Sequence, residues 1–425
     1  MLDKQLFSFY EQIKDDDYVI ASYFIELDCR ENVMDKVSSF AVGQTLGTWL
    51  PVPGINEAMR EKHMGKVINV YSVPPYELVQ EDETGKRAYI IQLAFPTINF
   101  GAQFPMLLTT LLGNDASTSA QVKLIDLQLP EKYVSEFNGP NFGMKGIREM
   151  TGVYDRPLIL NMIKPCTGIT PDIGAKIFYE TALGGVDLIK DDELLANPSF
   201  NNVASRIKKY KEAANQAFEI TGTRTKYVAN ITDSVDKIFS NAEHAEDLGV
   251  DAIMVNFAAV GYSTLHSLAK KVKVPILGHY ASAGMLYEGL SSGLSSQLAV
   301  GRFPRLAGAD MVVINTPYGN YPLSHQKYFE TVKELSLPYY SKKSVMPAVG
   351  GGVHPGMVPK YVNELGLDII MAVGGAIQGH PDGASAGGRA MRQGIELVIK
   401  EGSYSNIPDN MKELRKAVEN WGIKE

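Results

Sequence analysis

The sequence predicts an α/β fold in which an N-terminal α+β sheet domain is followed by a (β/α)8 TIM barrel. From residue 157 onward, short apolar segments alternate with amphipathic segments eight times in about 270 residues, as expected of a closed barrel. The first 136 residues mix strand-like and helix-like segments without this repeat. We therefore expect an α+β domain over residues 1–136 and a catalytic barrel over residues 137–425. A doubly wound open sheet is the competing architecture.

The N-terminal domain carries three segments with the β-branched and aromatic character of strands, and one helical segment between them. The helical segment covers residues 32–47. A segment rich in glycine and proline, 137–157, forms the predicted bridge to the barrel. The predicted strands are 18–27, 87–96 and 120–129.

The predicted barrel strands are short apolar runs, and the helical segments between them end close to a glycine. A helix after Gly379 closes the domain. The predicted strands are 158–164, 186–190, 226–232, 252–257, 274–279, 310–315, 346–352 and 369–375.

Composition excludes several classes of function. Lysine and arginine number 41 against 48 aspartates and glutamates, so the net charge of −7 leaves no basic face for nucleic acid. No apolar run reaches the length of a membrane span, and the acidic N-terminus does not resemble a signal peptide. The two cysteines, Cys29 and Cys166, lack metal-binding spacing and suit a reducing compartment. We expect a soluble cytoplasmic enzyme that acts on small molecules.

Polar residues or glycines end every predicted barrel strand, although the strand bodies are apolar. In a barrel, the chemistry gathers at these ends. Solvation of strand ends explains some of the asparagines, but it explains two lysines and a histidine less well. The residues at these ends are Lys164, Lys190, Asn230, Asn256, His279, Asn315, Gly350–Gly352 and Gly374–Gly375.

The stretch "GGVDLIKDDE", residues 184–193, suggests a divalent metal site. Mg²⁺ prefers hard oxygen ligands, and Asp192 and Glu193 supply two carboxylates. Lys190 becomes a ligand if its neutral amine captures CO2 as a carbamate, and an apolar environment favours the neutral amine. The alternative is that Lys190 forms ion pairs with these acids, or that all of them belong to a solvated loop.

Two glycine runs follow the seventh and eighth predicted strands, in "VGGGVHPG" and "VGGAIQGHPDG". Barrels often bind phosphate in these loops, because bare backbone N–H groups attract an anion and glycine allows close approach. Turns also need glycine, so one run alone would be weak support. We expect a phosphorylated substrate.

Several motifs together resemble the RuBisCO large-chain family. The stretch 184–193 resembles its activation motif, and "MIKP" at 162–165 resembles its catalytic-lysine strand. Lys164 and Lys190 lie 26 residues apart, a spacing that the family keeps. The likeness covers nearly the whole chain. It continues through "FNGPNFGMKGIR", "GH" at 278–279, "GGGVHPGMVP", "GGAIQGHP", "LGTW" at 46–49 and "GN" at 113–114.

The resemblance implies roles for the residues at the strand ends. Lys190, as a carbamate formed with CO2, would bind Mg²⁺ together with Asp192 and Glu193. Lys164 would move protons at the enolising carbon of the substrate. His279 would hold a hydroxyl or phosphate group of the substrate.

The resemblance also implies a homodimer whose active sites are shared between subunits. Asn114 of the neighbouring subunit would reach the metal-bound substrate. A phosphate cradle would combine glycines of the barrel with two residues of the neighbouring subunit: Gly351, Gly352, Gly374 and Gly375 with Thr48 and Trp49.

The departures from the family pattern argue against CO2 fixation. Carboxylating members have a lysine at Cys166, an arginine at Tyr280, a serine at Gly350 and a glutamate at Gly43. The sixth loop, "NTPYGNYPLSH", has an asparagine or tyrosine where they place a mobile lysine, and their strand-six histidine is replaced by an apolar residue. The chain therefore resembles a form IV, RuBisCO-like protein.

The enolisation half of the family's chemistry remains in this sequence. We expect decarboxylation of a phosphorylated 3-oxo sugar acid, of the 3-oxo-isoapionate-4-phosphate type, in carbohydrate breakdown. The alternatives from methionine salvage are a 2,3-diketo-5-methylthiopentyl-1-phosphate enolase or a 5-methylthioribulose-1-phosphate isomerase. That enolase places a lysine where this chain has Asn114. A non-catalytic scaffold is the alternative from another class, and the retained charge cluster argues against it.

Overall fold

The computed structural model describes residues 3–14, 17–48, 50, 52–78 and 84–424. The chain forms two compact units. The first unit comprises 1–137 together with 283–299, and the second comprises 138–282 together with 300–425. The segment 283–299 lies within the sequence of the predicted barrel but belongs to the first unit.

The first unit is built on a five-stranded sheet in the order β10-β4-β1-β3-β2. β1 and β3 pair antiparallel along their whole length, from Tyr18 opposite Pro96 to Asp28 opposite Lys86. The sequence missed β2 and the short β10, which pairs in parallel with β4. The strands are β1 Tyr18–Asp28, β2 Lys66–Val73, β3 Lys86–Pro96, β4 Lys123–Gln128 and β10 Gly293–Leu294.

Side-chain caps start two of the helices in this unit. Asn32 accepts a hydrogen bond from Met34 N (2.9 Å) before α2, and Asn56 accepts one from Met59 N (2.9 Å) before α3. The helical elements are α1 Tyr10–Ile13, α2 Val33–Gly43, α3 Glu57–His63, η1 Thr97–Asn99, α4 Phe104–Leu112, η2 Asp115–Ser119, α5 Glu131–Ser135 and α12 Gly284–Tyr287.

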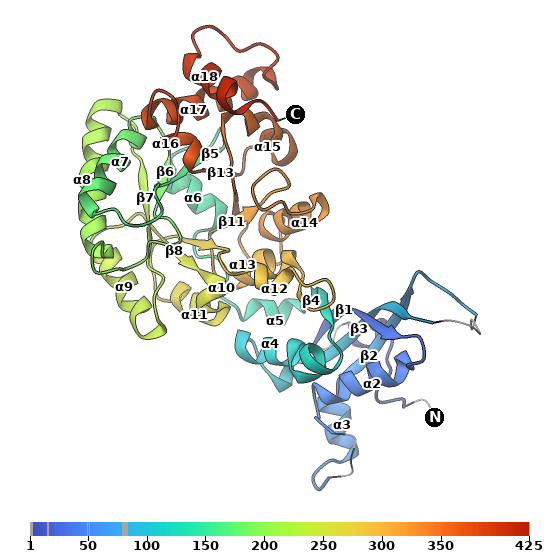
Figure 1. Ribbon diagram of the computed structural model, residues 1–425. Helices are drawn as coiled ribbons and strands as arrows, with labels where there is room; N and C mark the ends of the chain where they lie inside the picture. Colours follow the sequence, from blue (N-terminus) through green and yellow to red (C-terminus); the bar gives the residue numbers. More distant parts are fainter. Residues whose placement is uncertain (1–2, 15–16, 49, 51, 79–83, 425) are drawn as a thin grey trace. The chain divides into compact units, whose positions relative to one another are not determined.

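The second unit is a closed barrel of eight parallel strands, so the predicted fold class is confirmed (Figure 1). The register places Met162 opposite Lys190, and Asn256 opposite His279. Polar residues at the ends of neighbouring strands are therefore brought to one end of the barrel. The strands are β5 Leu158–Met162, β6 Leu188–Lys190, β7 Lys226–Asn230, β8 Ala252–Asn256, β9 Ile276–His279, β11 Met311–Asn315, β12 Met346–Gly350 and β13 Ile370–Val373.

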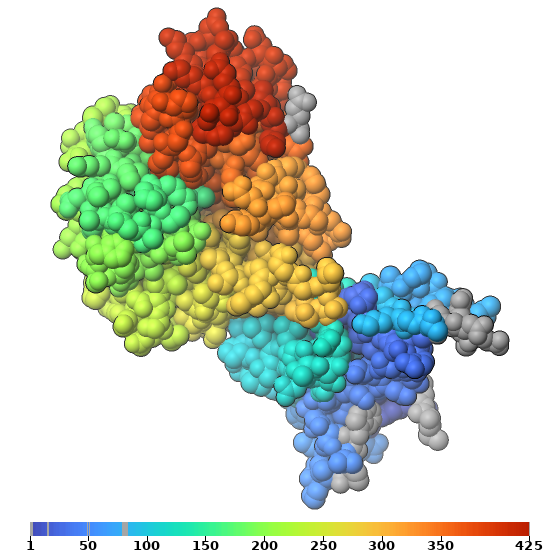
Figure 2. Space-filling view, viewed as in Figure 1, coloured from blue at the N-terminus to red at the C-terminus, as the bar shows by residue number. Residues whose placement is uncertain are grey.

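Helices alternate with these strands and surround them (Figure 1). The C-terminal helices α17 and α18, red in Figure 2, pack against each other at the surface of this unit. None of the helices in the described part of the chain combines the length and apolar character needed to cross a bilayer. The helical elements are α6 Gly143–Thr151, α7 Pro171–Ala182, α8 Val203–Thr221, α9 Val235–Asp247, α10 Phe257–Val260, α11 Tyr262–Ala269, α13 Phe303–Ala307, α14 His325–Ser336, η4 Pro355–Met357, α15 Val358–Leu365, α16 Gly375–Gln378, α17 Ala384–Glu401 and α18 Lys412–Trp421. One further element, η3 Gln297–Arg302, spans the boundary between the two units.

Helix α6 covers the end of the barrel where the strands begin. Ile147 is part of the buried core formed by the inward side chains of the strands. Met144 N donates to Ser344 O, just before β12 (2.7 Å), and Arg148 pairs with Asp368, just before β13 (2.9 Å). The sequence prediction treated this segment only as a bridge.

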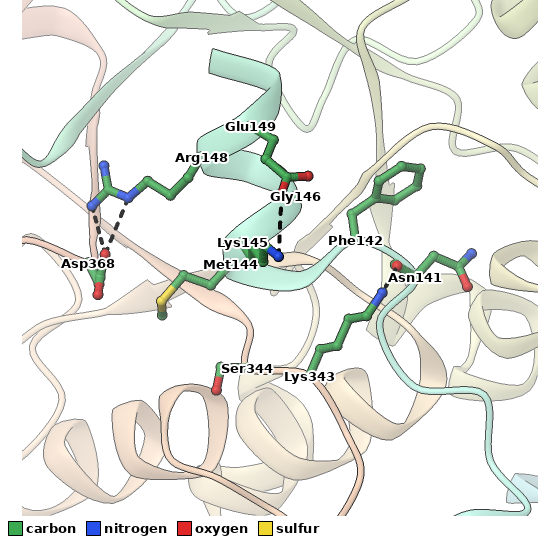
Figure 3. A pocket seen from close by; sticks show the side chains of 10 residues that line it. All are labelled: Asn141, Phe142, Met144, Lys145, Gly146, Arg148, Glu149, Lys343, Ser344 and Asp368. Carbon is green, nitrogen blue, oxygen red and sulfur yellow. Dashed lines mark hydrogen bonds and ion pairs between the residues drawn. The ribbon is translucent and has the colours of Figure 1, made fainter. Parts of the chain in front are cut away.

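A groove of about 630 Å³ lies beside α6 at this end (Figure 3). The charged side chains around it are paired with their neighbours: Lys145 with Glu149 (3.8 Å), and Arg148 with Asp368. Its lining residues Ser344 and Asp368 lie just before β12 and β13. The groove is therefore separate from the polar strand ends, which lie at the opposite end of the barrel.

Candidate active site

Lys190 ends β6 and is completely buried. Its Nζ donates a hydrogen bond to Asp191 O (2.9 Å) and lies 3.6 Å from Glu193 Oε2. Burial lowers the pKa of Lys190 below its ordinary value, although the nearby carboxylates of Glu193 and Asp192 act in the opposite direction. The structure thus provides the environment that favours a neutral amine at this position.

Lys164 and Asp192 form the shortest ion pair of the site. Lys164 Nζ lies 2.6 Å from Asp192 Oδ2, and it also donates to Cys166 Sγ at 3.1 Å. The Asp192 side chain is 1% exposed, whereas that of Lys164 is 35% exposed. Burial lowers the pKa of Lys164, but the hydrogen bonds to Asp192 and Cys166 outweigh it, so the pKa is raised overall. Lys164 is therefore held as an ammonium group in this pair.

Glu193 and His279 complete the charged part of the site. Glu193 Oε2 lies 3.4 Å from His279 Nε2. The Nδ1 atom of His279 accepts a hydrogen bond from Ala281 N (3.1 Å), so the proton of a neutral ring is on Nε2 and faces Glu193. Burial, followed by the charges of Lys190 and Lys164, lowers the pKa of His279 well below its ordinary value. The imidazole is thus a neutral hydrogen-bond donor.

Two asparagines donate hydrogen bonds to the backbone carbonyls of Asp192 and Glu193. Asn230 Nδ2 donates to Asp192 O (3.2 Å) and Glu193 O (3.3 Å), and Asn256 Nδ2 donates to Glu193 O (3.0 Å). Asn256 Oδ1 is buried and has no hydrogen-bond partner among the described residues. The amide cannot be reversed, because Oδ1 would then face the carbonyl of Glu193. This acceptor is a polar group that the protein itself leaves unpaired.

Asp191 points away from the site, as the alternation of an extended segment requires. Its carboxylate is completely buried and accepts hydrogen bonds from Tyr227 OH (2.9 and 2.8 Å), Asn230 N (2.9 Å) and Arg206 (3.1 Å). Asp191 is expected to be either a solvated acid or an acid behind the metal ligands, and its enclosure by Arg206 and Tyr227 excludes the first of these.

The two glycine loops lie at the same end of the barrel. Gly351 and Gly352 have φ values of +92° and +101°, in the region that favours glycine. Asn320 N donates to Gly351 O (2.8 Å), and a Cβ on Gly352 would lie 3.1 Å from Asn320 Oδ1. A Cβ on Gly374 would lie 3.4 Å from Lys164 Cε. The loop after β13 therefore adjoins the lysine end of the site.

Two of the predicted site residues that the structure describes lie outside the barrel unit. Asn114 is the residue before η2, and Thr48 Oγ1 accepts a hydrogen bond from Leu50 N (3.0 Å). Both belong to the first unit. Trp49 lies outside the described residues. Gly375, by contrast, begins α16 in the barrel, and a Cβ there would meet no atom within 4 Å.

The residues fit a hard divalent cation only if Lys190 supplies an oxygen. Within the described residues, no group of three or more histidine, cysteine, aspartate and glutamate side chains is arranged to hold a metal. Asp192 and Glu193 provide carboxylate oxygens, and the buried amine of Lys190 lies beside Glu193. A carbamate on that amine would supply the third oxygen, which is the donor type that Mg²⁺ prefers.

Arg206 and Tyr227 are parts of this region that the sequence does not predict. A signal was present: Arg206 falls on the buried stripe of α8 with Val203, Ile207 and Tyr210. A charged residue on such a stripe needs a buried partner. The sequence could not show that this partner is Asp191.

Comparison with known proteins agrees with the geometry. Residues 143–421 match the family of the ribulose bisphosphate carboxylase large chain, catalytic domain. A ribulose bisphosphate carboxylase-like protein of Archaeoglobus fulgidus is 43% identical over 416 residues, covering 96% of this chain and 94% of the relative. The 2,3-diketo-5-methylthiopentyl-1-phosphate enolase of Geobacillus thermodenitrificans is 35% identical over 408 residues, covering 95% of this chain and 98% of the relative.

A solved structure agrees as well. The rubisco-like protein of Alicyclobacillus acidocaldarius superposes with a TM-score of 0.88 at 34% identity, and the match covers 96% of this chain and 100% of that one. The predicted family is confirmed: the chain belongs to the RuBisCO large-chain family as a form IV, RuBisCO-like member.

Proposed function

We propose that the protein catalyses proton transfer at a carbon beside the carbonyl group of a phosphorylated keto compound, by way of an enolate. One observation carries the proposal. Lys164, the partly exposed lysine of the site, is held 2.6 Å from Asp192, directly beside the buried Lys190 and the turn at Glu193. A proton-carrying group and a set of oxygen ligands therefore adjoin each other.

Lys190, Asp192 and Glu193 would hold Mg²⁺. The neutral Lys190 amine would add to CO2, forming an N–C bond and releasing one proton, which leaves a carbamate. Bound there, Mg²⁺ would supply a Lewis acid that stabilises negative charge on substrate oxygens. Gly351, Gly352, Gly374 and Gly375 would bind the phosphate through backbone N–H groups.

Tautomerisation of a phosphorylated diketone is the overall reaction best supported. Relatives of this chain named 2,3-diketo-5-methylthiopentyl-1-phosphate enolase match it over nearly its whole length. Tautomerisation removes a proton from the carbon and adds one to the oxygen. Lys164, whose side chain is 35% exposed, would first give its ammonium proton to solvent. Its amine would then take the proton from the carbon and deliver it to the oxygen of the enolate. His279, a neutral donor, would hold a substrate hydroxyl.

Decarboxylation of a phosphorylated 3-oxo acid is the second candidate. Two observations favour it: the neutral Asn114 at the position where the salvage enolase has a lysine, and Lys164, which its ion pair keeps protonated. Loss of CO2 needs an electron sink and a proton donor, but no added base to begin.

The test is NMR of both substrate types in deuterated bicarbonate buffer with Mg²⁺. Deuterium exchange or tautomerisation of the diketone supports the first reaction, and release of CO2 from the 3-oxo acid supports the second. Lys164→Met should lose proton transfer but keep Mg²⁺ binding, whereas the exposed Lys145→Met should change neither. No turnover with either substrate, and no Mg²⁺ binding by calorimetry, would contradict the proposal and favour a scaffold.

We also propose that Asn114 and Thr48 act from the partner subunit of a homodimer. Mixing inactive Lys164→Met chains with inactive Asn114→Ala chains tests this sharing. Hybrid dimers would contain one intact site, so activity should reappear after the subunits exchange. If activity does not return although exchange is shown by mass spectrometry, the two residues act within one subunit.

A further inference from the structure

The proposed chemistry uses Asp192 and Glu193 but not Asp191, which is the most buried of these three acids. Asp191 lies between Lys190 and the pair Asp192 and Glu193, on the opposite side of the chain from Lys190 and Asp192. We propose that Asp191, Arg206 and Tyr227 form a positioning cage that sets the geometry of the ligand turn, residues 190–193, for Mg²⁺. This inference rests on the proposed function.

The cage saturates the Asp191 carboxylate. Tyr227 OH lies 2.9 and 2.8 Å from its two oxygens, Arg206 Nη2 lies 3.1 Å from Oδ2, and Asn230 N donates to Oδ2 at 2.9 Å. The side chains of Asp191 and Arg206 are completely buried, and Tyr227 is 1% exposed. These bonds, made among buried side chains, hold the carboxylate in one orientation.

Arg206 extends the cage to the loop that follows the ligand turn. Its guanidinium also donates to the carbonyls of Asn201 and Ala196, the second at 2.5 Å. Arg206 lies on α8, so one side chain ties the loop between β6 and α8 to both the helix and Asp191. The backbone on the C-terminal side of Glu193 is therefore held by the cage as well.

Asn230 connects the cage directly with the ligand turn. Its backbone N donates to Asp191, while its side chain donates to the carbonyls of Asp192 and Glu193. Any shift of Asp191 would move the backbone of both acidic ligands. A buried ion pair is weak support for stability alone, because apolar residues of similar volume often serve as well. The ion pair between Arg206 and Asp191 lies behind the proposed ligands Asp192 and Glu193, which favours a role in positioning them.

The chain offers a matched pair of variants for the test. Tyr227→Phe removes one donor to Asp191 and the acceptor of Arg206 Nε (3.4 Å), and it leaves the ion pair between Arg206 and Asp191 in place. Tyr210→Phe is the control: Tyr210 packs on Tyr227 (ring centroids 5.0 Å apart), it is completely buried, and its hydroxyl has no hydrogen-bond partner among the described residues. Both variants delete a buried tyrosine hydroxyl from the same part of the core, and only one of them touches Asp191.

The experiment titrates full-length protein with MgCl2 in bicarbonate buffer by calorimetry, and follows the carbamate of Lys190 with ¹³C-labelled bicarbonate by NMR. Tyr227→Phe should raise the Kd for Mg²⁺ about 10-fold or more, the loss typical when a partner behind a metal ligand is removed. Tyr210→Phe should leave the Kd unchanged. Asp191→Asn should weaken binding further, and if it does not fold, Tyr227→Phe decides alone.

An unchanged Kd in Tyr227→Phe, or equal weakening in both tyrosine variants, would overturn the cage and leave the proposed function standing. Wild-type protein that binds no Mg²⁺ in bicarbonate would overturn both the metal site and the cage. Activity on either substrate is measured in parallel, so a wrong substrate does not affect the outcome for the cage.

Discussion

The two ends of the barrel use charged residues in opposite ways. Where the strands begin, Arg156 contacts both oxygens of Asp187 at 2.6 and 2.7 Å. At the same end, Asp310 accepts three backbone hydrogen bonds, from Phe142, Gly143 and Ile276, at 2.7 to 2.9 Å. These contacts are short, whereas a second cation, Arg392, lies farther from Asp187, at 3.7 Å.

Where the strands end, several contacts are incomplete, although Lys164 pairs with Asp192 at 2.6 Å and the Asp191 carboxylate is fully hydrogen-bonded. Lys190 Nζ is 3.6 Å from Glu193, His279 is 3.4 Å from the same carboxylate, and Asn256 Oδ1 has no partner among the described residues. An unsatisfied buried group typically costs about 1–3 kcal/mol of stability. The comparison indicates that one end stabilises the fold, whereas the other keeps polar groups available for ligands.

The largest effect is expected at the end where the strands finish. Lys190→Met should lower kcat about 10²–10³-fold or more, because it removes the carbamate that is the proposed oxygen ligand of Mg²⁺. Mg²⁺ binding should be lost as well. Thermal unfolding should stay the same or shift upward, because an apolar side chain replaces a buried amine.

Assays at several bicarbonate concentrations, with a melting curve, check this prediction. Lys145→Met, at the other end of the barrel, is the control and should match the wild type. Full activity in Lys190→Met would contradict the carbamate site and, with it, the division of roles between the two ends.

The end of the barrel where the strands finish is easier to predict from the sequence than the end where they begin. All eight predicted strands are present, because apolar runs with polar ends leave a direct trace in the sequence. The structure brings together Lys164, Lys190, Asp192, Glu193 and His279, and their roles stay a prediction. Helix α6 was missed, because its glycines suggest a loop and its role depends on strand beginnings that are distant in sequence.

The second prediction concerns the end where the strands begin. Asp187→Ala should lower the free energy of unfolding by about 3 kcal/mol, because it leaves the guanidinium of Arg156 unpaired at a site where it is 14% exposed. Turnover per folded molecule should not change. Urea unfolding and an activity assay at equal folded concentration check this.

The matched control for that pair is a surface ion pair. Arg30→Ala breaks the pair between Arg30 and Asp28, in which the Arg30 side chain is 86% exposed, and should leave unfolding unchanged. A loss of turnover in Asp187→Ala beyond the loss of folded protein would contradict the separation of the two ends.

The third prediction concerns pH. The folded-state pKa of His279 lies well below its ordinary value, so below about pH 6.5 the unfolded chain binds a proton that the folded chain does not. Stability is then fully present above that pH and falls as the pH is lowered, by at most about 1.4 kcal/mol per pH unit. His279→Gln should remove this part of the dependence.

The free energy of unfolding of wild type and variant is measured with urea at about pH 7.5 and about pH 5.5, roughly 1 unit on either side of the ordinary histidine pKa. The change between the two pH values is then compared. The exposed His244 provides the control, since His244→Gln should keep the wild-type dependence. If His279→Gln shows the same slope with pH as wild type, the imidazole is not held neutral by its burial in the site.

The smallest effect is expected in the loop between β11 and α14, which contacts Gly351, a glycine of the proposed phosphate site. Tyr318 OH donates to Glu364 and lies 3.0 Å from His325 Nε2, and Asn320 of the same loop contacts Gly351. Tyr318→Phe removes the hydroxyl contacts only. Losing about 1 kcal/mol of loop positioning should raise KM about fivefold with little change in kcat.

Tyr154→Phe is a suitable control, because Tyr154 is exposed between α6 and β5, near the beginnings of the strands. It should change neither constant. A fall in kcat with KM unchanged in Tyr318→Phe would mean that the loop acts on the reacting atoms and does not merely hold the substrate. The hydroxyl contacts of Tyr318 would then belong with the chemistry of Lys164, and the loop would be part of the reactive end of the barrel.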